Sequence, residues 1–417
     1  MAGGDVGVFR NNVKISPDGQ QVIYLADQDV NGVNELYSIP IVGGTAVKLN
    51  EDLAAGGDVA GFEISPDSQR VIYQADQDVD GVLELYSVPI ANGEVTKLNP
   101  NLGVSDDILS FIITPNSQQV VYRSGSFGAG VIELYTVPIS GGESIKLNTN
   151  LVSGGDVSGR VRISSNSQYV VYQADQDIDG VDELYSVSIG EGTVEKLNAS
   201  FVNGGDIQSF EISPNSQKVV YRADQDIDGV NEIYSVPIAG GIPTKLNDDL
   251  VTDGDVLIFK MSSDSRRVVY TADQDVDEID ELYSVSIDGG EVVRLSPDLA
   301  FDQDVAATYV ISPDNQWVLY RAAAERDSDK LDELYSVSIL GEQETIISSS
   351  LSAPTSIFVE DVDFIFSNDN RFIIYRSNQD RFDQDELFSV QVILPEVPET
   401  IFYKIPLPEG KSVILPL

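Results

Sequence analysis

Residues 64–99 read ISPDSQRVIYQADQDVDGVLELYSVPIANGEVTKLN, and recognisable copies of this stretch fill almost the whole 417-residue chain. The hydrophobic residue before the Ser-Pro-Asp turn marks each copy, and successive marks are 49, 49, 50, 49, 49, 50 and 55 residues apart. The marks are Ile15, Ile64, Ile113, Ile163, Ile212, Met261, Ile311 and Phe366. A repeat of about 50 residues over eight copies is typical of a propeller or another repeat array.

Each copy is predicted to form four short strands. In the second copy these span residues 58–64, 70–74, 84–90 and 95–98, with a tight Ser-Pro-Asp-Ser turn after the first. Their β-branched and aromatic residues favour strands, and no helical apolar period appears. The sequence therefore predicts an all-β fold without significant helix: an eight-bladed β-propeller of four-stranded antiparallel blades. A β-solenoid is the alternative.

We expect a single propeller domain over residues 1–417, because no Pro-, Gly- or Ser-rich linker separates the copies. Residues 400–405 are expected to finish the eighth blade, and residues 407–417 to form an extra strand or tail. The eighth blade would then close the ring by packing on the first. The expected blades span residues 5–50, 51–99, 100–148, 149–198, 199–247, 248–296, 297–348 and 349–406.

The charge of the chain limits its partners. Lys plus Arg number 25 and Asp plus Glu number 68, so the formal net charge is −43. Such a field repels nucleic acid and anionic membrane surfaces and attracts cations. No apolar run reaches the ~18 residues that a membrane span needs. We therefore expect no nucleic acid, no membrane insertion and a monomer, with a protein, peptide or glycan ligand that the sequence does not identify.

The chain contains neither Cys nor His. Their absence excludes disulfides, thiolate chemistry and the Ser-His-Asp and Cys-His arrangements within these residues. Carboxylate chemistry of the glycosidase type is the remaining catalytic option. The near-uniform copies argue against it, because an active site needs one asymmetric set of residues.

The loop between the second and third strands carries the most informative motif, Asp-Gln-Asp-Val-Asp-Gly-Val-Leu-Glu at residues 76–84. Oxygen ligands at positions 1, 3 and 5, a Gly at position 6 and an acid at position 9 are suited to a hard cation such as calcium. Four loops match this pattern fully. The predicted metal ligands are Asp27, Asp29, Asn31 and Glu35; Asp76, Asp78, Asp80 and Glu84; Asp175, Asp177, Asp179 and Glu183; and Asp224, Asp226, Asp228 and Glu232.

Other copies depart from the motif. The sixth has Glu278 at the Gly position, which makes its turn doubtful, and the third loop, residues 125–130, has no acid. The alternative to calcium is a solvated hairpin loop in which Asp-Gly supplies the turn. Acids of the Gly-Gly-Asp connections are expected at the same end of each blade, where they either complete cation sites or cap turns. These acids are Asp58, Asp156 and Asp206, together with Asp255, which follows Asp253-Gly254 in the equivalent connection.

Two further residue types recur. Paired tyrosines, such as Tyr73 and Tyr86, are expected to pack between blades with their hydroxyls at the wet edge. The lysine of the Lys-Leu-Asn ending, such as Lys97, is expected to protect the outer sheet edge from pairing with another chain.

Residues 16–19 (Ser-Pro-Asp-Gly), residues 35–44 (ELYSIPIVGG) and the Lys-Leu-Asn endings resemble the TolB-like propeller repeat of bacteria over nearly all of residues 5–392. The resemblance implies a propeller and, in family members, protein or ligand binding, sometimes beside a hydrolase domain. The acidic loops resemble the compact calcium loops of integrin-type propeller repeats.

These observations favour a non-enzymatic, calcium-binding propeller that acts as a secreted or surface binding and adhesion scaffold. A TolB-like periplasmic adaptor that binds a peptide or protein in the channel is one alternative, and a carboxylate-based carbohydrate-active enzyme is another. We accordingly expect a secreted, periplasmic or cell-surface location, with no signal peptide in this sequence.

Overall fold

The structure is a computed structural model. It describes residues 12–100, 102, 106–126, 130–190, 192–299, 304–323, 332–342, 344–347, 364–377, 386–391 and 402–405. The chain divides into two compact units: unit 1 comprises residues 1–199, 216–219 and 237–242, and unit 2 comprises residues 200–215, 220–236 and 243–417. We find no helix in the described ranges, and hence none with the length and apolarity needed to cross a membrane.

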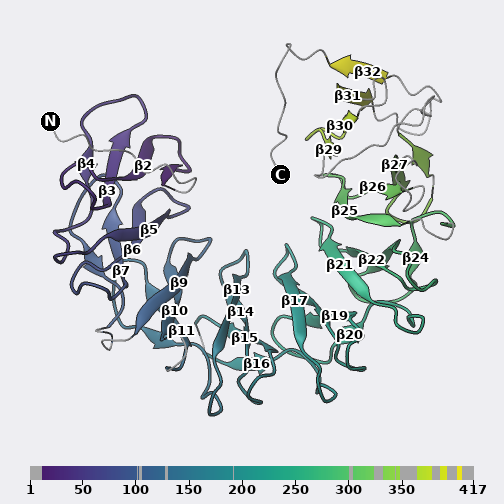
Figure 1. The fold of residues 1–417 in the computed structure, drawn as a ribbon, viewed down its shortest axis with the longest axis horizontal. Coiled ribbons are helices and arrows are strands. Elements are labelled where there is room, and N and C mark those ends of the chain that lie inside the picture. The colour runs from purple at the N-terminus through teal and green to yellow at the C-terminus, as the bar shows by residue number, and fades with distance from the viewer. Residues whose placement is uncertain are drawn as a thin grey trace. The chain divides into compact units, whose positions relative to one another are not determined.

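Unit 1 contains the first four sheets, each made of four consecutive strands in sequence order (Figure 1). They are β1 (Val13–Ile15), β2 (Gln21–Ala26), β3 (Glu35–Pro40) and β4 (Val47–Lys48); β5 (Val59–Ile64), β6 (Arg70–Ala75), β7 (Glu84–Pro89) and β8 (Thr96–Lys97); β9 (Asp107–Ile113), β10 (Gln119–Gly125), β11 (Glu133–Pro138) and β12 (Ile145–Lys146); and β13 (Val157–Ile163), β14 (Tyr169–Ala174), β15 (Glu183–Ser188) and β16 (Val194–Lys196).

Unit 2 contains the last four sheets, apart from short segments of the fifth that belong to unit 1. They are β17 (Ile207–Ile212), β18 (Lys218–Ala223), β19 (Glu232–Pro237) and β20 (Thr244–Lys245); β21 (Val256–Met261), β22 (Arg267–Ala272), β23 (Glu281–Ser286) and β24 (Val293–Arg294); β25 (Val305–Ile311), β26 (Trp317–Ala323), β27 (Asp332–Ser338) and β28 (Thr345–Ile346); and β29 (Phe364–Phe366), β30 (Phe372–Ser377), β31 (Glu386–Gln391) and β32 (Phe402–Ile405).

Each repeat therefore forms one antiparallel four-stranded sheet, and the eight sheets are the blades of a β-propeller, as predicted. Among the described strands, none of one copy joins the sheet of another, so the solenoid alternative is wrong. In the eighth blade Lys404 pairs with Phe388, as Lys97 pairs with Tyr86 in the second, so β32 finishes that blade as expected. Residues 407–417 lie outside the described residues, and the single-domain and ring-closure expectations stay predictions.

The Ser-Pro-Asp-Ser turn between the first two strands of a blade also connects neighbouring blades. Ser68 adopts a left-handed φ of 59°, and its Oγ accepts a hydrogen bond from Asp18 N of the preceding blade at 3.0 Å. Ser117 has the same conformation (φ 60°) and accepts from Asp67 N at 3.1 Å. The left-handed region costs an L-residue about 1–2 kcal/mol. We infer that the bond to the neighbouring blade offsets that cost and keeps Ser at this position.

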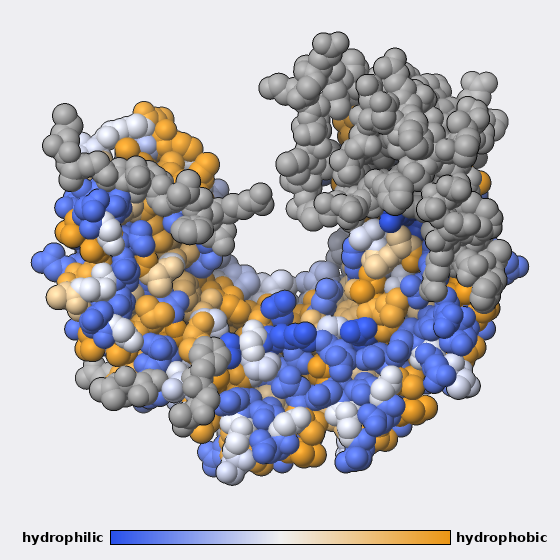
Figure 2. Space-filling model, viewed as in Figure 1, coloured by the Kyte–Doolittle hydropathy of each residue, from blue (hydrophilic) through white to orange (hydrophobic). Residues whose placement is uncertain are grey.

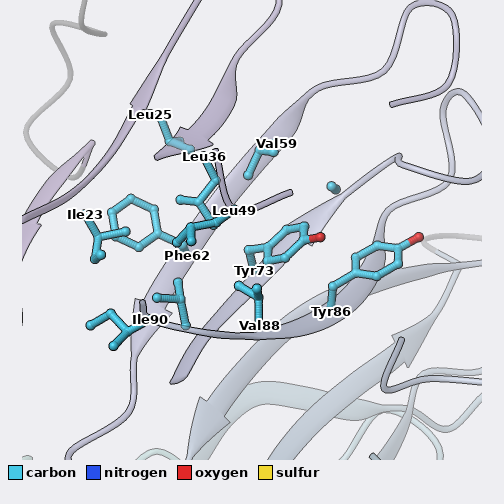
Figure 3. Close-up of a cluster of buried hydrophobic side chains, with 12 residues drawn as sticks. Ile23, Leu25, Leu36, Leu49, Val59, Phe62, Tyr73, Tyr86, Val88 and Ile90 are labelled. Atoms are coloured by element: carbon cyan, nitrogen blue, oxygen red, sulfur yellow. The ribbon is translucent and has the colours of Figure 1, made fainter. Parts of the chain in front are cut away.

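Successive sheets within a unit pack face to face through aliphatic and aromatic side chains. Strand alternation directs Ile23, Leu25 and Leu36 of the first blade toward Phe62 and Val88 of the second, and all five are at most 5% exposed (Figure 3). Equivalent clusters join the second blade to the third and the third to the fourth in unit 1, and three more join successive blades of unit 2. Most of the apolar burial that stabilises the fold therefore lies between blades.

The paired tyrosines belong to these clusters. Tyr73 and Tyr86 stack with ring centroids 5.2 Å apart, and both side chains are buried. Packing between blades is confirmed, but the wet-edge expectation for the hydroxyls is wrong. The Tyr73 hydroxyl donates to Gln77 Oε1 at 2.8 Å and the Tyr86 hydroxyl to Glu84 Oε2 at 2.9 Å, and both acceptors are buried.

Candidate functional site

The first acid of the described acidic loops closes the loop onto backbone amides. Asp76 accepts hydrogen bonds at Oδ2 from Gly81 N (3.1 Å) and at Oδ1 from Asp58 N. The same two bonds recur at Asp175 and Asp224, and Asp27 accepts from Gly32 N at 3.0 Å. Since both oxygens of Asp76, Asp175 and Asp224 hold backbone amides, position 1 supplies the turn itself.

The ninth residue of the motif is a buried glutamate at the start of the third strand. Glu84 is 3% exposed, its Oε2 accepts from the Tyr86 hydroxyl at 2.9 Å, and its Oε1 accepts from Lys97 Nζ. We call this arrangement the Glu/Tyr/Lys cluster. It recurs at Glu35, Tyr37 and Lys48; Glu133, Tyr135 and Lys146; Glu183, Tyr185 and Lys196; and Glu232, Tyr234 and Lys245, with Arg294 as the cation beside Glu281 and Tyr283.

The third residue of the motif reaches the same lysine in two of the matched loops. Lys97 Nζ donates to Asp78 Oδ2 at 2.9 Å, and Lys196 Nζ to Asp177 Oδ2 at 3.2 Å. Asp29 and Asp177 also donate from their main-chain nitrogens to the ninth-position glutamates, at 3.3 and 3.1 Å. In these blades a lysine side chain therefore pairs with carboxylates that the motif predicted to be metal ligands.

The fourth and fifth positions form an exposed tip. Asp80, Asp179 and Asp228 are exposed, and in the described part of the chain no hydrogen bond or ion pair involves their carboxylates. The aliphatic residue beside each acid is about half exposed: Val79 52%, Ile178 53% and Ile227 58%, with Val30 (52%) beside Asn31 in the first loop. We call these four pairs the loop tips. Figure 2 likewise shows hydrophobic and hydrophilic residues interspersed over the described surface in view.

The arrangement does not fit a calcium site. Calcium takes six to eight oxygen ligands in proteins. Within the described ranges no three Asp or Glu side chains converge on a point where they could hold a metal ion. Positions 1 and 9 are occupied by backbone amide, lysine and tyrosine donors, and position 3 is paired with the lysine in the second and fourth blades. Calcium therefore stays a prediction from the motif.

The third blade shows which carboxylate the fold uses. Its loop has no acid, yet Glu133 Oε1 still accepts from Lys146 Nζ at 2.7 Å and Glu133 Oε2 from the Tyr135 hydroxyl at 2.6 Å. The ninth-position glutamate thus belongs to the sheet and not to a ligand set. The doubtful turn of the sixth loop forms as well, because Glu278 adopts the left-handed conformation (φ 61°) that Gly81 has in the second (φ 77°).

The acid of the connection before a blade joins neighbouring blades in the second, fourth and sixth copies. Asp58 Oδ1 accepts from Asn34 N of the preceding blade at 2.6 Å while its own main-chain nitrogen binds Asp76. Asp156 and Asp255 accept in the same way from Ile132 N and Asn231 N, both at 2.6 Å, and Asp206 N donates to Asp224 Oδ1 at 2.6 Å. The connections and the acidic loops therefore share one end of the second, fourth, fifth and sixth blades, as predicted, and these acids cap turns.

The cluster perturbs the titration of its members. Burial alone would raise the pKa of Glu35, but hydrogen bonds from Lys48 and Tyr37 outweigh burial and hold that pKa below its ordinary value. The same balance lowers the pKa of Glu133. Burial and the neighbouring Glu35 together raise the pKa of Tyr37 well above its usual range. At neutral pH Glu35 is therefore a carboxylate and Tyr37 a neutral phenol.

Sequence reasoning missed the role of the lysine. Lys97 was expected to protect a sheet edge, yet it pairs with a buried glutamate of its own blade. A signal was present: the glutamate and the basic residue are 13 positions apart in every described blade with this cluster. The spacing and the positive charge are kept at Glu281 and Arg294, where arginine replaces lysine.

Solved structures resemble this fold. A Porphyromonas gingivalis dipeptidyl peptidase 4 matches with a TM-score of 0.54 and 11% identity over 92% of this chain and 58% of that one. An oligogalacturonate lyase in complex with manganese matches at 0.40 and 16% over 78% and 87%, and a TolB described as putative, from Agrobacterium tumefaciens, at 0.32 and 18% over 60% and 84%. At these identities the likeness shows the propeller fold alone. No protein-family model and no curated protein matches the chain.

The comparison corrects the expectation of a non-enzymatic adhesion scaffold, together with the expectation that the chain has no part in enzymes. Among the structures that share its fold is a dipeptidyl peptidase. The uniform repeats do not speak against catalysis, because the residues common to the copies, such as Glu84, Tyr86 and Asp58, stabilise the fold. Their uniformity carries no information about catalysis. This chain spans 58% of the length of the dipeptidyl peptidase structure.

Proposed function

We propose that this propeller is the peptide-binding part of a peptide-processing enzyme and that it selects peptides with cationic and aliphatic side chains. The observation that carries the proposal is the loop tip, which repeats an exposed aliphatic residue beside an exposed, unbonded carboxylate in the second, fourth and fifth blades. The resemblance to a dipeptidyl peptidase over 92% of the chain supports the enzymatic context.

The net negative charge of the chain favours basic over acidic peptides. With a net charge of −43, the chain attracts basic peptides and repels acidic ones at distances up to the Debye length, about 8 Å at physiological salt. A free carboxylate next to an apolar side chain provides both an ion-pair partner and a small apolar contact. A polyuronate substrate is disfavoured for the same reason, because its acidic units would face the same field.

The chemistry is assigned to residues outside this sequence. The 417 residues contain no His and no Cys, so a Ser-His-Asp or Cys-His arrangement needs groups from elsewhere. In the proposed enzyme the propeller binds and orients the peptide, and orientation lowers the barrier by converting a bimolecular encounter into a positioned one. Location outside the cytoplasm, in the periplasm, at the surface or in the medium, remains part of the proposal.

Isothermal titration with three synthetic peptides of equal length tests the proposal. One combines Lys with Ile, one replaces Lys by Glu, and one replaces Ile by Ser. At physiological salt we expect the Lys/Ile peptide to bind, the Lys/Ser peptide to bind more weakly and the Glu/Ile peptide not to bind. Mass spectrometry of the mixtures should recover the peptides intact, and a cut peptide would place the chemistry within these residues.

Matched variants locate the binding surface. The triple substitution Asp80→Asn, Asp179→Asn and Asp228→Asn removes three tip charges and should abolish binding of the Lys/Ile peptide. The control removes three exposed acids from the outer hairpins, Glu94→Gln, Glu143→Gln and Glu291→Gln, with the same change in net charge. Equal losses in both triples would mean that only the overall field attracts the peptide, and indifference to peptide charge would overturn the proposal.

A further inference from the structure

The hairpin between β7 and β8 contains an asparagine in a glycine conformation. Asn92 has a φ of 84°, and the equivalent positions in other blades are glycines: Gly43 (φ 90°), Gly141 (φ 93°), Gly240 (φ 91°) and Gly289 (φ 82°). The residue after Asn92 is Gly93, so this turn is an exposed Asn-Gly pair. The chain has two other Asn-Gly pairs, Asn31-Gly32 and Asn203-Gly204.

The side chain of Asn92 folds back over the next peptide unit. Gly93 N lies 2.8 Å from Asn92 Oδ1, so the side-chain amide carbon and the following main-chain nitrogen are already held in one compact ring. Reactions between groups held at contact distance gain the entropy that a random approach would cost. We propose that Asn92 is a site of spontaneous deamidation, with water as the only co-reactant.

The reaction balances with groups present in the turn. Gly93 N attacks Cγ of Asn92, forming the N–Cγ bond, and the Cγ–Nδ2 bond breaks. The side-chain amide nitrogen leaves as ammonia with the proton from Gly93 N, and a cyclic imide remains. Water then opens the imide at Cγ, which gives aspartate, or at the main-chain carbonyl, which gives isoaspartate with one additional methylene in the backbone.

Asn31 is protected by its environment. Gly32 N donates to Asp27 Oδ2 at 3.0 Å, so the nitrogen that would have to lose its proton is bonded to a carboxylate. A negative charge beside that nitrogen opposes its deprotonation. At Asn203 no hydrogen bond in the described part of the chain holds the side-chain amide over Gly204. The three pairs therefore share a sequence motif and differ in geometry.

Isoaspartate at position 92 should disturb the hairpin. The turn is tightly packed against Pro89, because a Cβ at Gly93 would lie 2.8 Å from Pro89 Cγ. β8 follows this turn and carries Lys97, the partner of buried Glu84. Conversion is expected to lower the melting temperature of the aged protein, and Asn92→Gly, which restores the residue of four other blades, should prevent that loss.

Ageing the folded protein at mildly alkaline pH and mapping peptides by mass spectrometry tests the proposal. Asn92 should convert to aspartate and isoaspartate several-fold faster than Asn31 or Asn203. In urea, where the geometry is lost, the three rates should converge. Equal rates in the folded protein, or faster conversion at Asn31, would overturn the proposal, as would the same fall in melting temperature for aged wild type and aged Asn92→Gly.

Discussion

The substitution Lys97→Met tests whether the Glu/Tyr/Lys cluster stabilises the fold. Lys97 Nζ bonds both Glu84 and Asp78, and Glu84 is 3% exposed while the Lys97 side chain is 23% exposed. Met keeps the length of the aliphatic stem and removes the charge. Glu84 is then left as a buried carboxylate whose remaining side-chain donor is the Tyr86 hydroxyl at 2.9 Å.

The expected loss follows from burial. Removing one partner of a buried ion pair costs about 3–5 kcal/mol, and exposed pairs contribute about 0.2–1 kcal/mol. Since Lys97 is partly exposed, we expect the lower end of the buried range, about 3 kcal/mol. In the third blade the Glu133 side chain is 26% exposed and that of Lys146 34%, so Lys146→Met should cost about 1 kcal/mol or less.

Urea unfolding at neutral pH measures the loss of unfolding free energy in both variants. The two losses can be compared if the m-value is unchanged. The double variant Glu84→Gln and Lys97→Met should regain part of the stability lost by Lys97→Met, because no buried charge remains. Three results would refute the reasoning: equal losses for Lys97→Met and Lys146→Met, a larger loss for Lys146→Met, or no recovery in the double variant.

Three further outcomes are expected. Glu35 and Glu133 have folded pKa values below their unfolded value of about 4.3, so their contribution to stability is present above about pH 4.3 and is lost as pH falls through the folded pKa. The midpoint of urea unfolding should therefore fall as pH is lowered through this range. The fall should be less steep in Glu133→Gln, which has one of these carboxylates fewer. Because lysine occupies the cluster, wild-type melting temperatures should be equal in calcium and in chelator, and a rise in calcium that Asp78→Asn reduces would instead establish the metal site. Ser117→Ala should cost about 1 kcal/mol more than Ser117→Gly, because both lose the bond to Asp67 N and only glycine adopts φ 60° without strain; equal urea midpoints would contradict this.

The repeat period predicted the architecture because each copy forms one blade. Within a blade, alternate residues of a strand pack against the two neighbouring blades. Ile72 faces the third blade and Tyr73 the first, and that alternation is visible in the sequence. Strand ends were less predictable. The fourth strand was expected over residues 95–98 and spans Thr96–Lys97, because an outermost strand has one neighbour and no further sheet to extend its pairing.

The blade-to-blade bonds were invisible to pattern analysis. Ser68 reads as an ordinary turn residue, and only the structure shows that its positive φ places Oγ against Asp18 N, 50 positions away. At Glu278 the sequence was misleading in the other direction. A charged residue at a glycine position suggested that the turn would not form, yet the turn forms. The sequence identifies residues such as glycine that adopt the left-handed conformation readily. Tertiary contacts decide which residues of other types are held in that conformation.

The acidic loop shows why a motif and a site can differ. Its acids match the spacing of a calcium loop because both structures must form a sharp turn from Asp and Gly. What separates them is the location of positive charge, and Lys97 lies 13 positions beyond Glu84, on another strand, where no local motif includes it. The third blade decides between the two readings for the ninth position: without any loop acid, Glu133 and Lys146 still pair. The ninth-position carboxylate is therefore explained by the fold, whereas the loop-tip carboxylates of Asp80, Asp179 and Asp228 make no hydrogen bond or ion pair in the described part of the chain.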